Sequence, residues 1–541
     1  SQTEWNHAYQ AMSRLYMVLL SKDTPSPFAL ENNEVKVDEA KAIAPQAKSD
    51  KKGKADAPAA KPETAIVKID VDGIADRIIA LPVDVAYYGN YACVDGKVYF
   101  SQFIPEQRKS VAKVYDLNKK SETELGEGLR FRISASGKKM LVAKGRSYAV
   151  VDLPSSKVSL DKPIDLSNMK VWVDYSMEWK QIYDESWRQM RDFFYVENMH
   201  GVDWKAMHAK YSVLLPYVKH RADLTYIIGE LIGELNVGHA YVNSGDMPRP
   251  ERINVGLLGA KLSKQQNGYF RIDDILQGAS WSKTLRSPLQ AVGANVAVGD
   301  YILAVDGQNL SATADIYQQL IGKANQTVEL LVNSKPDLAG ARKVLVEPIA
   351  DESQLYYYRW VQGNIKKVND ATNGEVGYIH IPDMGVDGLN EFVKHFYPQL
   401  QKKALVIDDR GNGGGNVSPM LLERLAREPY RTNMRRGSNL SSPIPAQTHI
   451  GPKVLLINNY SASDGDLFPY GFRQLKLGPI IGVRTWGGIV GISGSLPFVD
   501  GGDLRKPEFT SYGLDSGDWI IEGYGVDPDV RVDNDPYREY M

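Results

Sequence analysis

The sequence predicts a multidomain α+β protein with four successive parts. Short apolar segments separated by turn residues fill positions 1–170, which indicates a β-rich part. Apolar residues recur at helical spacing within 171–250, and a second β-rich part follows over 251–349. From 350 to 541, apolar strands alternate with helices, a pattern typical of a largely parallel sheet with right-handed crossovers.

Composition narrows the function classes. The 541 residues carry a net charge of -2, so nothing indicates nucleic acid or an acidic membrane surface as a partner. No segment approaches the ~20 apolar residues of a membrane span. The single Cys93 excludes a disulfide within the chain, and the eight histidines lack metal-ligand spacing. We therefore expect no metal and no cofactor. Because the chain begins at Ser1, we expect a fragment or a processed form.

The first part reads as β-structure around one insert. Residues 15–20 form an apolar run that predicts a buried strand, whereas 36–64 is rich in Ala, Lys, Asp and Pro and predicts a mobile linker. Evenly spaced strands after the insert fit two or three blades of a β-propeller, so we expect them to complete a propeller begun upstream. The predicted strands are 66–71, 77–81, 97–101, 112–117, 129–133, 139–143 and 148–153.

A helix with one apolar face dominates the second part. Its face runs from Leu224 to Leu235 at three- and four-residue intervals, and Asn236 and Gly238 end it. His239 follows at once, on the loop at the helix tip. A histidine at a loop start is usually a surface residue, but the anchored helix would also suit a side chain that must be held in place.

The third part contains Gly256-Leu257-Leu258-Gly259 and, further on, Gly299-Asp300-Tyr301-Ile302-Leu303-Ala304-Val305-Asp306-Gly307, followed by a short helix over 314–321. On these stretches it resembles a PDZ domain. The resemblance implies that the loop Gly256–Gly259 presents backbone N–H groups to a peptide carboxylate, beside a strand that pairs with the peptide. Packing against a neighbouring domain is the alternative role.

In the fourth part, the loops after the strands lie where active sites of parallel sheets are found. Strands are predicted at 376–381, 404–407, 454–457 and 480–483, helices at 386–400, 418–427 and 464–475, and the loops are 408–416, 458–464 and 484–494.

Ser463 lies at the sharpest of these corners. An apolar strand ends at Ile457, a small-residue turn follows, and a helix begins with Asp464 and Asp466 in its first turn. Such a corner lifts a serine out of the sheet, as in a nucleophile elbow, although Gly-x-Ser-x-Gly is absent. The alternative is that Ser463 only caps the helix.

Two further stretches suit acyl-transfer chemistry. Gly413 and Gly414 lie in a run of three glycines, whose N–H groups could form an oxyanion hole together with the N–H of Asp464. A phosphate loop or a structural turn are the alternatives, and the Lys-Ser/Thr pair of a phosphate loop is missing. Glu522, between an apolar strand and Gly523, could orient a catalytic base or be a solvated charge.

These stretches, behind the PDZ-like part and the helical part that ends in Gly238-His239, resemble the tricorn peptidases over essentially the whole chain. The resemblance implies an α/β domain of the crotonase/ClpP-like spiral type, with Ser463 as nucleophile, His239 as general base and Glu522 orienting that base. It also implies oxyanion donors from Gly413 or Gly414 with Asp464. It further implies peptide substrates, a homohexamer and a cytoplasmic location, with the periplasm as the alternative.

Two glycines depart from the related patterns. Gly238 stands where the tricorn family usually has a serine that relays between the acid and the histidine. Gly488 stands where the related C-terminal processing peptidases carry a catalytic lysine, which favours the histidine mechanism. The sequence thus predicts a serine peptidase that forms an acyl-enzyme. The alternatives are a catalytically silent peptide-binding scaffold and an acyl-CoA enzyme of the crotonase type.

Overall fold

The computed structural model describes residues 12–29, 67–104, 109–248, 250–279, 281–282, 285–437, 441–492, 494, 496–535 and 537. These residues belong to two compact units, 1–172 and 173–541, and each unit is described by itself. The predicted linker over 36–64 lies outside the described residues. Among the residues described, no helix has both the length and the apolar character needed to span a membrane.

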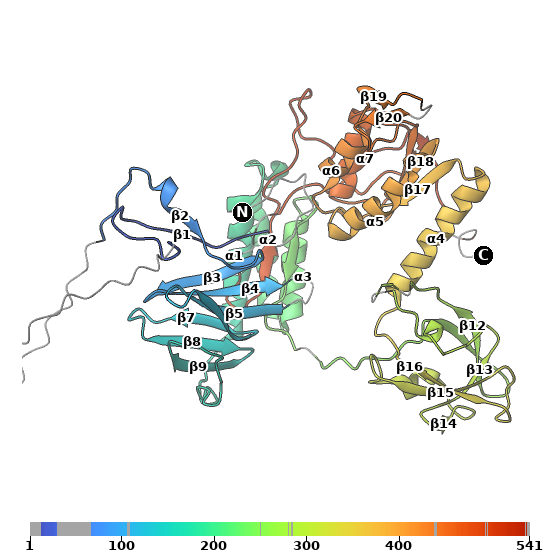
Figure 1. Ribbon diagram of the computed structural model, residues 1–541, viewed down its shortest axis with the longest axis horizontal. Helices are drawn as coiled ribbons and strands as arrows, with labels where there is room; N and C mark the ends of the chain where they lie inside the picture. Colours follow the sequence, from blue (N-terminus) through green and yellow to red (C-terminus); the bar gives the residue numbers. More distant parts are fainter. Residues whose placement is uncertain are drawn as a thin grey trace, which may run out of the picture. The chain divides into compact units, whose positions relative to one another are not determined.

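The first unit consists of antiparallel sheets (Figure 1). Strands β3 to β6 form one sheet in sequence order, β7 to β9 form a second, and β1 pairs with β2. Buried side chains such as Tyr99, Leu125 and Met140 pack into its core. The strands are β1 (Tyr16–Val18), β2 (Ile78–Ala80), β3 (Tyr87–Val94), β4 (Lys97–Ile104), β5 (Lys109–Asp116), β6 (Ser121–Glu127), β7 (Arg130–Ile133), β8 (Lys139–Lys144) and β9 (Ser147–Asp152).

Two predictions for this unit are wrong. The strand within 15–20 forms, but it is not buried, since Tyr16 is 61% exposed in a pair of only two strands. The part of the predicted strand 66–71 that the structure describes is not a strand. Its Asp70 carboxylate instead accepts a hydrogen bond from the Lys22 N–H (2.8 Å), which holds the segment as a loop. Strands β3 and β6 were not among those predicted.

The helical part opens the second unit. It comprises α1 (Tyr175–Phe193), α2 (Trp204–Ser212) and α3 (Arg221–Gly233), followed by the short strand β10 (Tyr241–Asn243). The predicted apolar face of α3 is buried, with Leu224, Ile228 and Leu231 fully enclosed. Phe498 and Leu504, from much later in the chain, share this core. Leu504 lies in β23 (Asp503–Arg505), which pairs with β10, so the segment after His239 is fixed to the C-terminal part of the chain.

The third part folds around an antiparallel sheet in the order β11-β12-β13-β15-β16, with β14 beside β13. Leu258, Ile302 and Leu330 are among the side chains in its core. A 3-10 helix over Ile316–Leu320 takes the place of the predicted short helix. The strands are β11 (Ala260–Lys264), β12 (Phe270–Ile275), β13 (Tyr301–Val305), β14 (Gln308–Asn309), β15 (Val328–Asn333) and β16 (Arg342–Val346).

The fourth part contains the predicted parallel sheet. A 19-residue helix, α4 (Ser353–Ala371), precedes it and was not predicted. The five strands of the sheet run parallel in the order β17-β18-β21-β22-β24. They are β17 (Val376–His380), β18 (Ala404–Asp408), β21 (Lys453–Ile457), β22 (Ile480–Gly482) and β24 (Val530–Arg531). A separate antiparallel pair is formed by β19 (Arg431–Met434) and β20 (Ser441–Ile444).

Helices α5 (Val386–Phe396), α6 (Ser418–Leu425) and α7 (Asp464–Gln474) pack with this sheet (Figure 1). Phe392, Phe468 and Phe472 are buried in their common core. Because β18 and β21 are parallel neighbours, the loops that follow them lie at one edge of the sheet.

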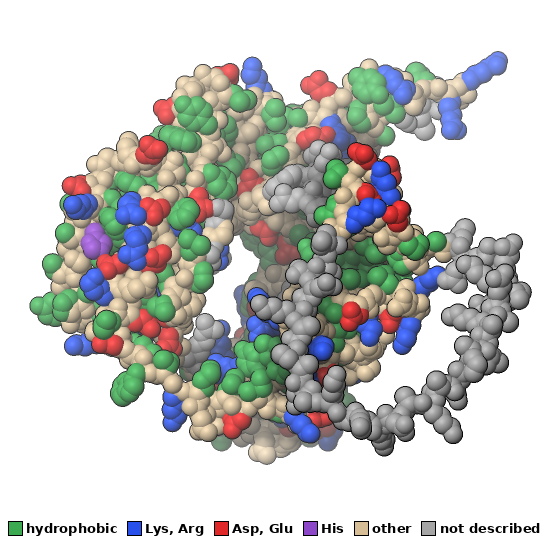
Figure 2. Space-filling model, turned by 90° about the vertical axis from the view of Figure 1, so that its left-hand side faces the viewer, with side chains coloured by type: hydrophobic (Ala, Val, Ile, Leu, Met, Phe, Trp, Pro, Cys, Tyr) green, Lys and Arg blue, Asp and Glu red, His purple; other side chains and the backbone are tan. Residues whose placement is uncertain are grey.

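On the face drawn in Figure 2, acidic and basic side chains are interspersed, and neither sign gathers into a large patch.

Candidate active site

Ser463 occupies a strained corner between β21 and α7. It is the N-cap of α7 and has φ 60° and ψ -120°, a backbone conformation that costs a serine on the order of 1–3 kcal/mol. The Ser463 N–H donates to Asp466 Oδ2 at 2.8 Å, which helps to hold that conformation. The side chain is half-buried. The strand, turn and helix predicted around Ser463 are thus present.

The neighbouring Ser461 has a different environment. It is fully buried, its hydroxyl donates to the Asp409 carbonyl at 2.8 Å, and its Oγ accepts from the Asn458 N–H at 3.2 Å. These bonds tie the turn to the loop after β18. Ser461 therefore stabilises the corner, and Ser463 is the serine left at its apex.

The glycine loop packs directly on Ser463. A Cβ on Gly414 would lie 2.5 Å from Ser463 Cβ and 3.1 Å from the Asp464 nitrogen, so only glycine allows this approach. Gly414 also has φ 90°. Two of the predicted oxyanion donors, Gly414 and Asp464, therefore lie next to the serine. In this conformation, however, the Gly414 N–H donates to Asn412 Oδ1 (2.9 Å), and the Gly413 N–H makes a long contact of 3.4 Å with the Pro382 carbonyl.

Asn412 organises this loop. It is fully buried, and its amide donates to the Ile381 carbonyl (3.1 Å) and to Asp409 Oδ1 (2.9 Å). Its own carbonyl accepts from the Ala462 N–H at 2.9 Å. Burial near the carboxylates of Asp408 and Asp466 raises the pKa of Asp409 well above its usual range. Sequence reasoning missed both Asn412 and Asp409, because their partners lie on separate strands and loops.

Asp464 has its side chain turned to a structural partner. Its carboxylate accepts from the Ser418 N–H at 2.9 Å and from the Ser418 hydroxyl. Burial raises its pKa, and these bonds oppose the rise. The carboxylate thus joins α7 to α6, which leaves only the backbone N–H of Asp464 for the predicted oxyanion role.

His239 lies between α3 and β10 in the left-handed backbone region, at φ 56°. Its Nδ1 is 3.1 Å from the Tyr241 hydroxyl, and its ring meets the Trp486 ring edge-on at 5.5 Å. Its Nε2 is buried without a hydrogen-bond partner. Burial lowers the pKa of His239, and the negative charge of Glu522 partly opposes that shift. The lowered pKa favours the neutral imidazole, which is the form that a general base requires.

The Glu522 carboxylate accepts hydrogen bonds from backbone N–H groups and makes none with the His239 imidazole. One carboxylate oxygen accepts from the Gly238 N–H (2.9 Å), and the other accepts from the N–H groups of Ile489 (2.7 Å) and Val490 (3.1 Å). The acid thus fixes the peptide immediately before His239. A Cβ on Gly238 would lie 2.8 Å from Gly488 Cα, so the position of the family's relay serine is filled by backbone here.

The structure therefore gathers the predicted residues into two groups. Ser463, Gly413, Gly414 and Asp464 form one, and His239 with Glu522 forms the other. Across the residues described, no hydrogen bond connects His239 with Ser463 directly. The described residues also contain no cluster of three or more His, Cys, Asp or Glu that could bind a metal.

The predicted carboxylate-binding loop of the third part is bonded within the chain. The N–H groups of Gly256 and Leu257 donate to the carbonyls of Leu320 and Ile349, both at 2.8 Å. The Gly259 N–H donates to the Glu352 carboxylate at 2.7 Å. Burial raises the pKa of Glu352, which the backbone N–H donors oppose. Leu258 is buried in the core of the sheet. The loop does bind a carboxylate here, but it is one from the same chain.

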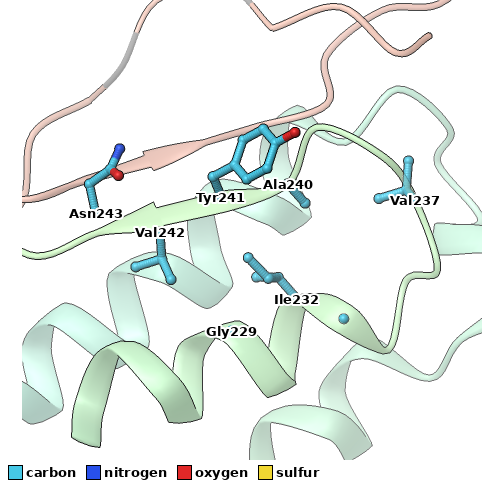
Figure 3. A pocket seen from close by; sticks show the side chains of 8 residues that line it. Gly229, Ile232, Val237, Ala240, Tyr241, Val242 and Asn243 are labelled. Atoms are coloured by element: carbon cyan, nitrogen blue, oxygen red, sulfur yellow. The ribbon is translucent and has the colours of Figure 1, made fainter. Parts of the chain in front are cut away.

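A pocket of about 380 Å³ lies beside the histidine loop (Figure 3). Two glycines of α3, Gly229 and Gly233, form one wall, and Val237, Tyr241 and Val242 line the other sides. A Cβ on either glycine would meet nothing within 4 Å, so the glycines keep this space open.

Three segments match known families. Residues 175–233 match the Tricorn protease C1 domain, 256–351 the Tricorn protease PDZ domain and 375–532 the Peptidase family S41. Tricorn protease homolog 1 of Streptomyces coelicolor is 35% identical over 87% of this chain and 45% of its own length. The crystal structure of the tricorn protease superposes with a TM-score of 0.76 at 28% identity, over 89% of this chain and 48% of that one. A tail-specific protease of Haemophilus influenzae is 26% identical over 53% of this chain and 43% of its own.

The fold and the matched segments define a multidomain protein of peptidase family S41, related to the tail-specific and C-terminal processing proteases. Within that class, the chain is a homologue of the tricorn protease, and the putative tricorn-like protease C-terminal subunit of Sulfurisphaera tokodaii is 31% identical to it over 98% of this chain and 59% of its own length. This chain spans about half the length of the curated tricorn relatives that it matches. The predicted fold class, with its β-sheet region, helical C1 domain, PDZ domain and α/β catalytic domain, is confirmed.

Proposed function

We propose that this chain is a serine peptidase in which Ser463 attacks the peptide carbonyl. The observation that carries the proposal is the strained corner of Ser463, which Asp466 holds and which packs on Gly414. A serine kept in such a backbone conformation between a parallel strand and a helix is typical of a nucleophile.

His239 is the proposed general base. Its unpartnered Nε2 takes the proton as Ser463 Oγ bonds to the carbonyl carbon, and the imidazolium then protonates the leaving amine as the C–N bond breaks. Water hydrolyses the acyl-enzyme by the same route. The nearby charge of Glu522 stabilises the imidazolium. This step requires His239 and Ser463 to approach further, because no hydrogen bond joins them in the described residues.

The proposed oxyanion hole combines the N–H groups of Asp464 and of Gly413 or Gly414. Such donors typically contribute about 2.7–4 kcal/mol each to lowering the barrier. The Gly414 N–H would have to leave Asn412 Oδ1, so substrate binding is expected to rearrange this loop. Peptides rather than folded proteins are the proposed substrates, and a homohexamer is the proposed assembly, both from the similarity to the tricorn protease.

A second candidate function is a catalytically silent peptide-binding scaffold. It is favoured by the occupied Gly414 N–H, by the absence of a direct bond between His239 and Ser463 among the residues described, and by Gly238 in place of the relay serine.

A fluorophosphonate probe distinguishes the two functions. The probe is expected to label the wild type at Ser463, as shown by peptide mapping, and Ser463→Ala is expected to lose both labelling and peptide hydrolysis. Ser516→Ala, which changes an exposed serine of the same domain, is the matched control and should behave as the wild type. His239→Ala is expected to slow labelling by several orders of magnitude. Absence of labelling in a folded wild-type protein would support the silent scaffold.

A further inference from the structure

Asp466 makes more contacts than a helix-capping acid needs. It is fully buried, one carboxylate oxygen accepts from the Ser463 N–H (2.8 Å), and the other accepts from the Gly487 N–H (2.7 Å). Burial raises the pKa of Asp466, and the nearby Thr485 side chain and Gly488 N–H oppose that rise. An N3 acid of a capping box explains only the first of these contacts. The remaining contacts connect the nucleophile corner to a segment that lies about twenty residues further along the chain.

That segment, Thr485–Val490, is here called the bridging segment. Its Gly488 packs against the histidine loop, since a Cβ on Gly238 would lie 2.8 Å from Gly488 Cα. At its far end, the N–H groups of Ile489 and Val490 share the Glu522 carboxylate with the Gly238 N–H. Two carboxylates thus hold the bridging segment from opposite sides, one bonded to the Ser463 backbone and the other to the peptide before His239.

The bridging segment is itself held by further contacts, which leave little freedom to either carboxylate. The Trp486 N–H donates to the Ser461 carbonyl at 3.0 Å, and the Gly487 carbonyl accepts from the Gly523 N–H at 2.7 Å. A Cβ on Gly487 would lie 2.5 Å from the Gly525 nitrogen. A displacement at one carboxylate would therefore be transmitted to the other as a shift of the same backbone. Hydrogen bonds from backbone N–H groups to a buried carboxylate are among the stronger ones in proteins.

We propose that Asp466 is a positioning residue that holds Ser463 in its strained conformation and in register with His239 through the bridging segment. The inference rests on the proposed peptidase function and extends it to a residue that does not touch the substrate. A misplacement of the nucleophile by about 1 Å can cost on the order of 100-fold in rate. The loss of Asp466 should therefore reduce the rate of chemistry more than the affinity for substrate.

The test compares Asp466→Asn with the wild type and with Asp529→Asn. Asp529 is the matched control, since its carboxylate also accepts a backbone N–H, that of Ile480 at 2.8 Å, in the same domain. Fluorophosphonate labelling rates per folded molecule, kcat and KM for a peptide, and Tm are measured for each. Asp466→Asn is expected to lower the labelling rate and kcat about 10- to 100-fold while KM stays within about threefold. Asp529→Asn should leave both rates near the wild-type values.

A milder variant covers the case in which Asp466→Asn fails to fold. Thr485→Val keeps the carboxylate but removes the hydroxyl that fixes the start of the bridging segment by accepting the Val526 N–H at 2.8 Å, and it is expected to slow labelling by roughly two- to tenfold. Wild-type labelling rates in folded Asp466→Asn, or in Thr485→Val if the first variant is unfolded, would overturn the inference and leave the proposed peptidase intact. A rate loss of the same size in Asp529→Asn would also overturn it, by showing a general effect of stability. A wild type that is never labelled would refute the peptidase and this inference together.

Discussion

Replacing Glu522 with glutamine tests how the acid supports the proposed base. The carboxylate accepts three backbone N–H groups, from Gly238, Ile489 and Val490. A glutamine side chain has one oxygen and one NH2 group, so at least one of these N–H groups faces a donor and loses its acceptor. Losing a hydrogen bond to a charged group costs about 1.5–3 kcal/mol. If the pair that shares one oxygen is kept, the bond to Gly238, next to His239, is the one lost.

The same change removes a charge that favours the imidazolium. Burial lowers the pKa of His239 below its ordinary value, and Glu522 partly opposes that shift. The base must be neutral to act, so kcat/KM of the wild type should fall only below about pH 6.5, the ordinary histidine pKa. In Glu522→Gln the opposing charge is gone, and the acidic limb should move to still lower pH. Activity above the limb should fall about 10- to 100-fold, the equivalent of the lost bond.

The assay is a pH–rate profile of kcat/KM with a peptide substrate, together with Tm for both proteins. Asp503→Asn, which changes a carboxylate bonded to the Asn243 amide near the same loop, serves as the control. A limb that moves to higher pH, or full activity in Glu522→Gln, would refute the reasoning. A limb above about pH 8.5 in the wild type would indicate a lysine base and refute the histidine mechanism.

Two further predictions address the two backbone loops. Gly414→Ala places a Cβ 2.5 Å from Ser463 Cβ at a positive φ, so labelling by a fluorophosphonate should be lost. The control is Gly363→Ala, within α4, where a Cβ would meet nothing within 4 Å, so this change should be neutral or stabilising. Normal labelling of Gly414→Ala would contradict the close packing. Glu352→Ala removes the internal carboxylate from the Gly259 N–H, so this variant should bind a fluorescent peptide with a free C-terminus more tightly than the amidated form of the same peptide. Binding is measured by fluorescence anisotropy, with Asp351→Asn as the neighbouring control. Equal binding of both peptides would show that the loop only joins parts of the structure.

The sequence carries strong signals for elements whose stability is local. The parallel strands β17, β18, β21 and β22 and the helices that follow them could be predicted, because short apolar strands alternate with amphipathic helices between clear turn residues. The two-residue strand β24 was not predicted. Helix α4 could not, since its Tyr356-Tyr357-Tyr358 run favours a strand by propensity. Its buried Leu355 and Val361 show that tertiary packing decides the outcome.

Motifs indicated which residues could take part in chemistry, but not which distant groups of the chain would form hydrogen bonds with them. Ser463 was singled out because it follows an apolar strand at a turn. Glu522 was singled out on the same predicted pattern, but the structure has no strand immediately before it, so that part of the prediction is wrong. Asp466 read as an acid placed favourably at a helix start, although its second oxygen bonds to Gly487, 21 residues away. Likewise, Glu352 lies 93 residues from Gly259, so no local pattern predicts that it fills that loop. Contacts of this kind follow from tertiary structure alone.

The close packing of Gly238 on Gly488 restricts how this protein could acquire a relay serine. A side chain at 238 requires the bridging segment to retreat, yet that segment is bonded to both Asp466 and Glu522. A single Gly238→Ser change would therefore disturb the surroundings of the proposed nucleophile Ser463 and the proposed base His239 together. Position 238 and the segment Thr485–Val490 are expected to show strong epistasis, because a serine at 238 would be tolerated only together with changes in that segment. A route from this candidate active site to one with a relay serine thus passes through coordinated substitutions rather than one step.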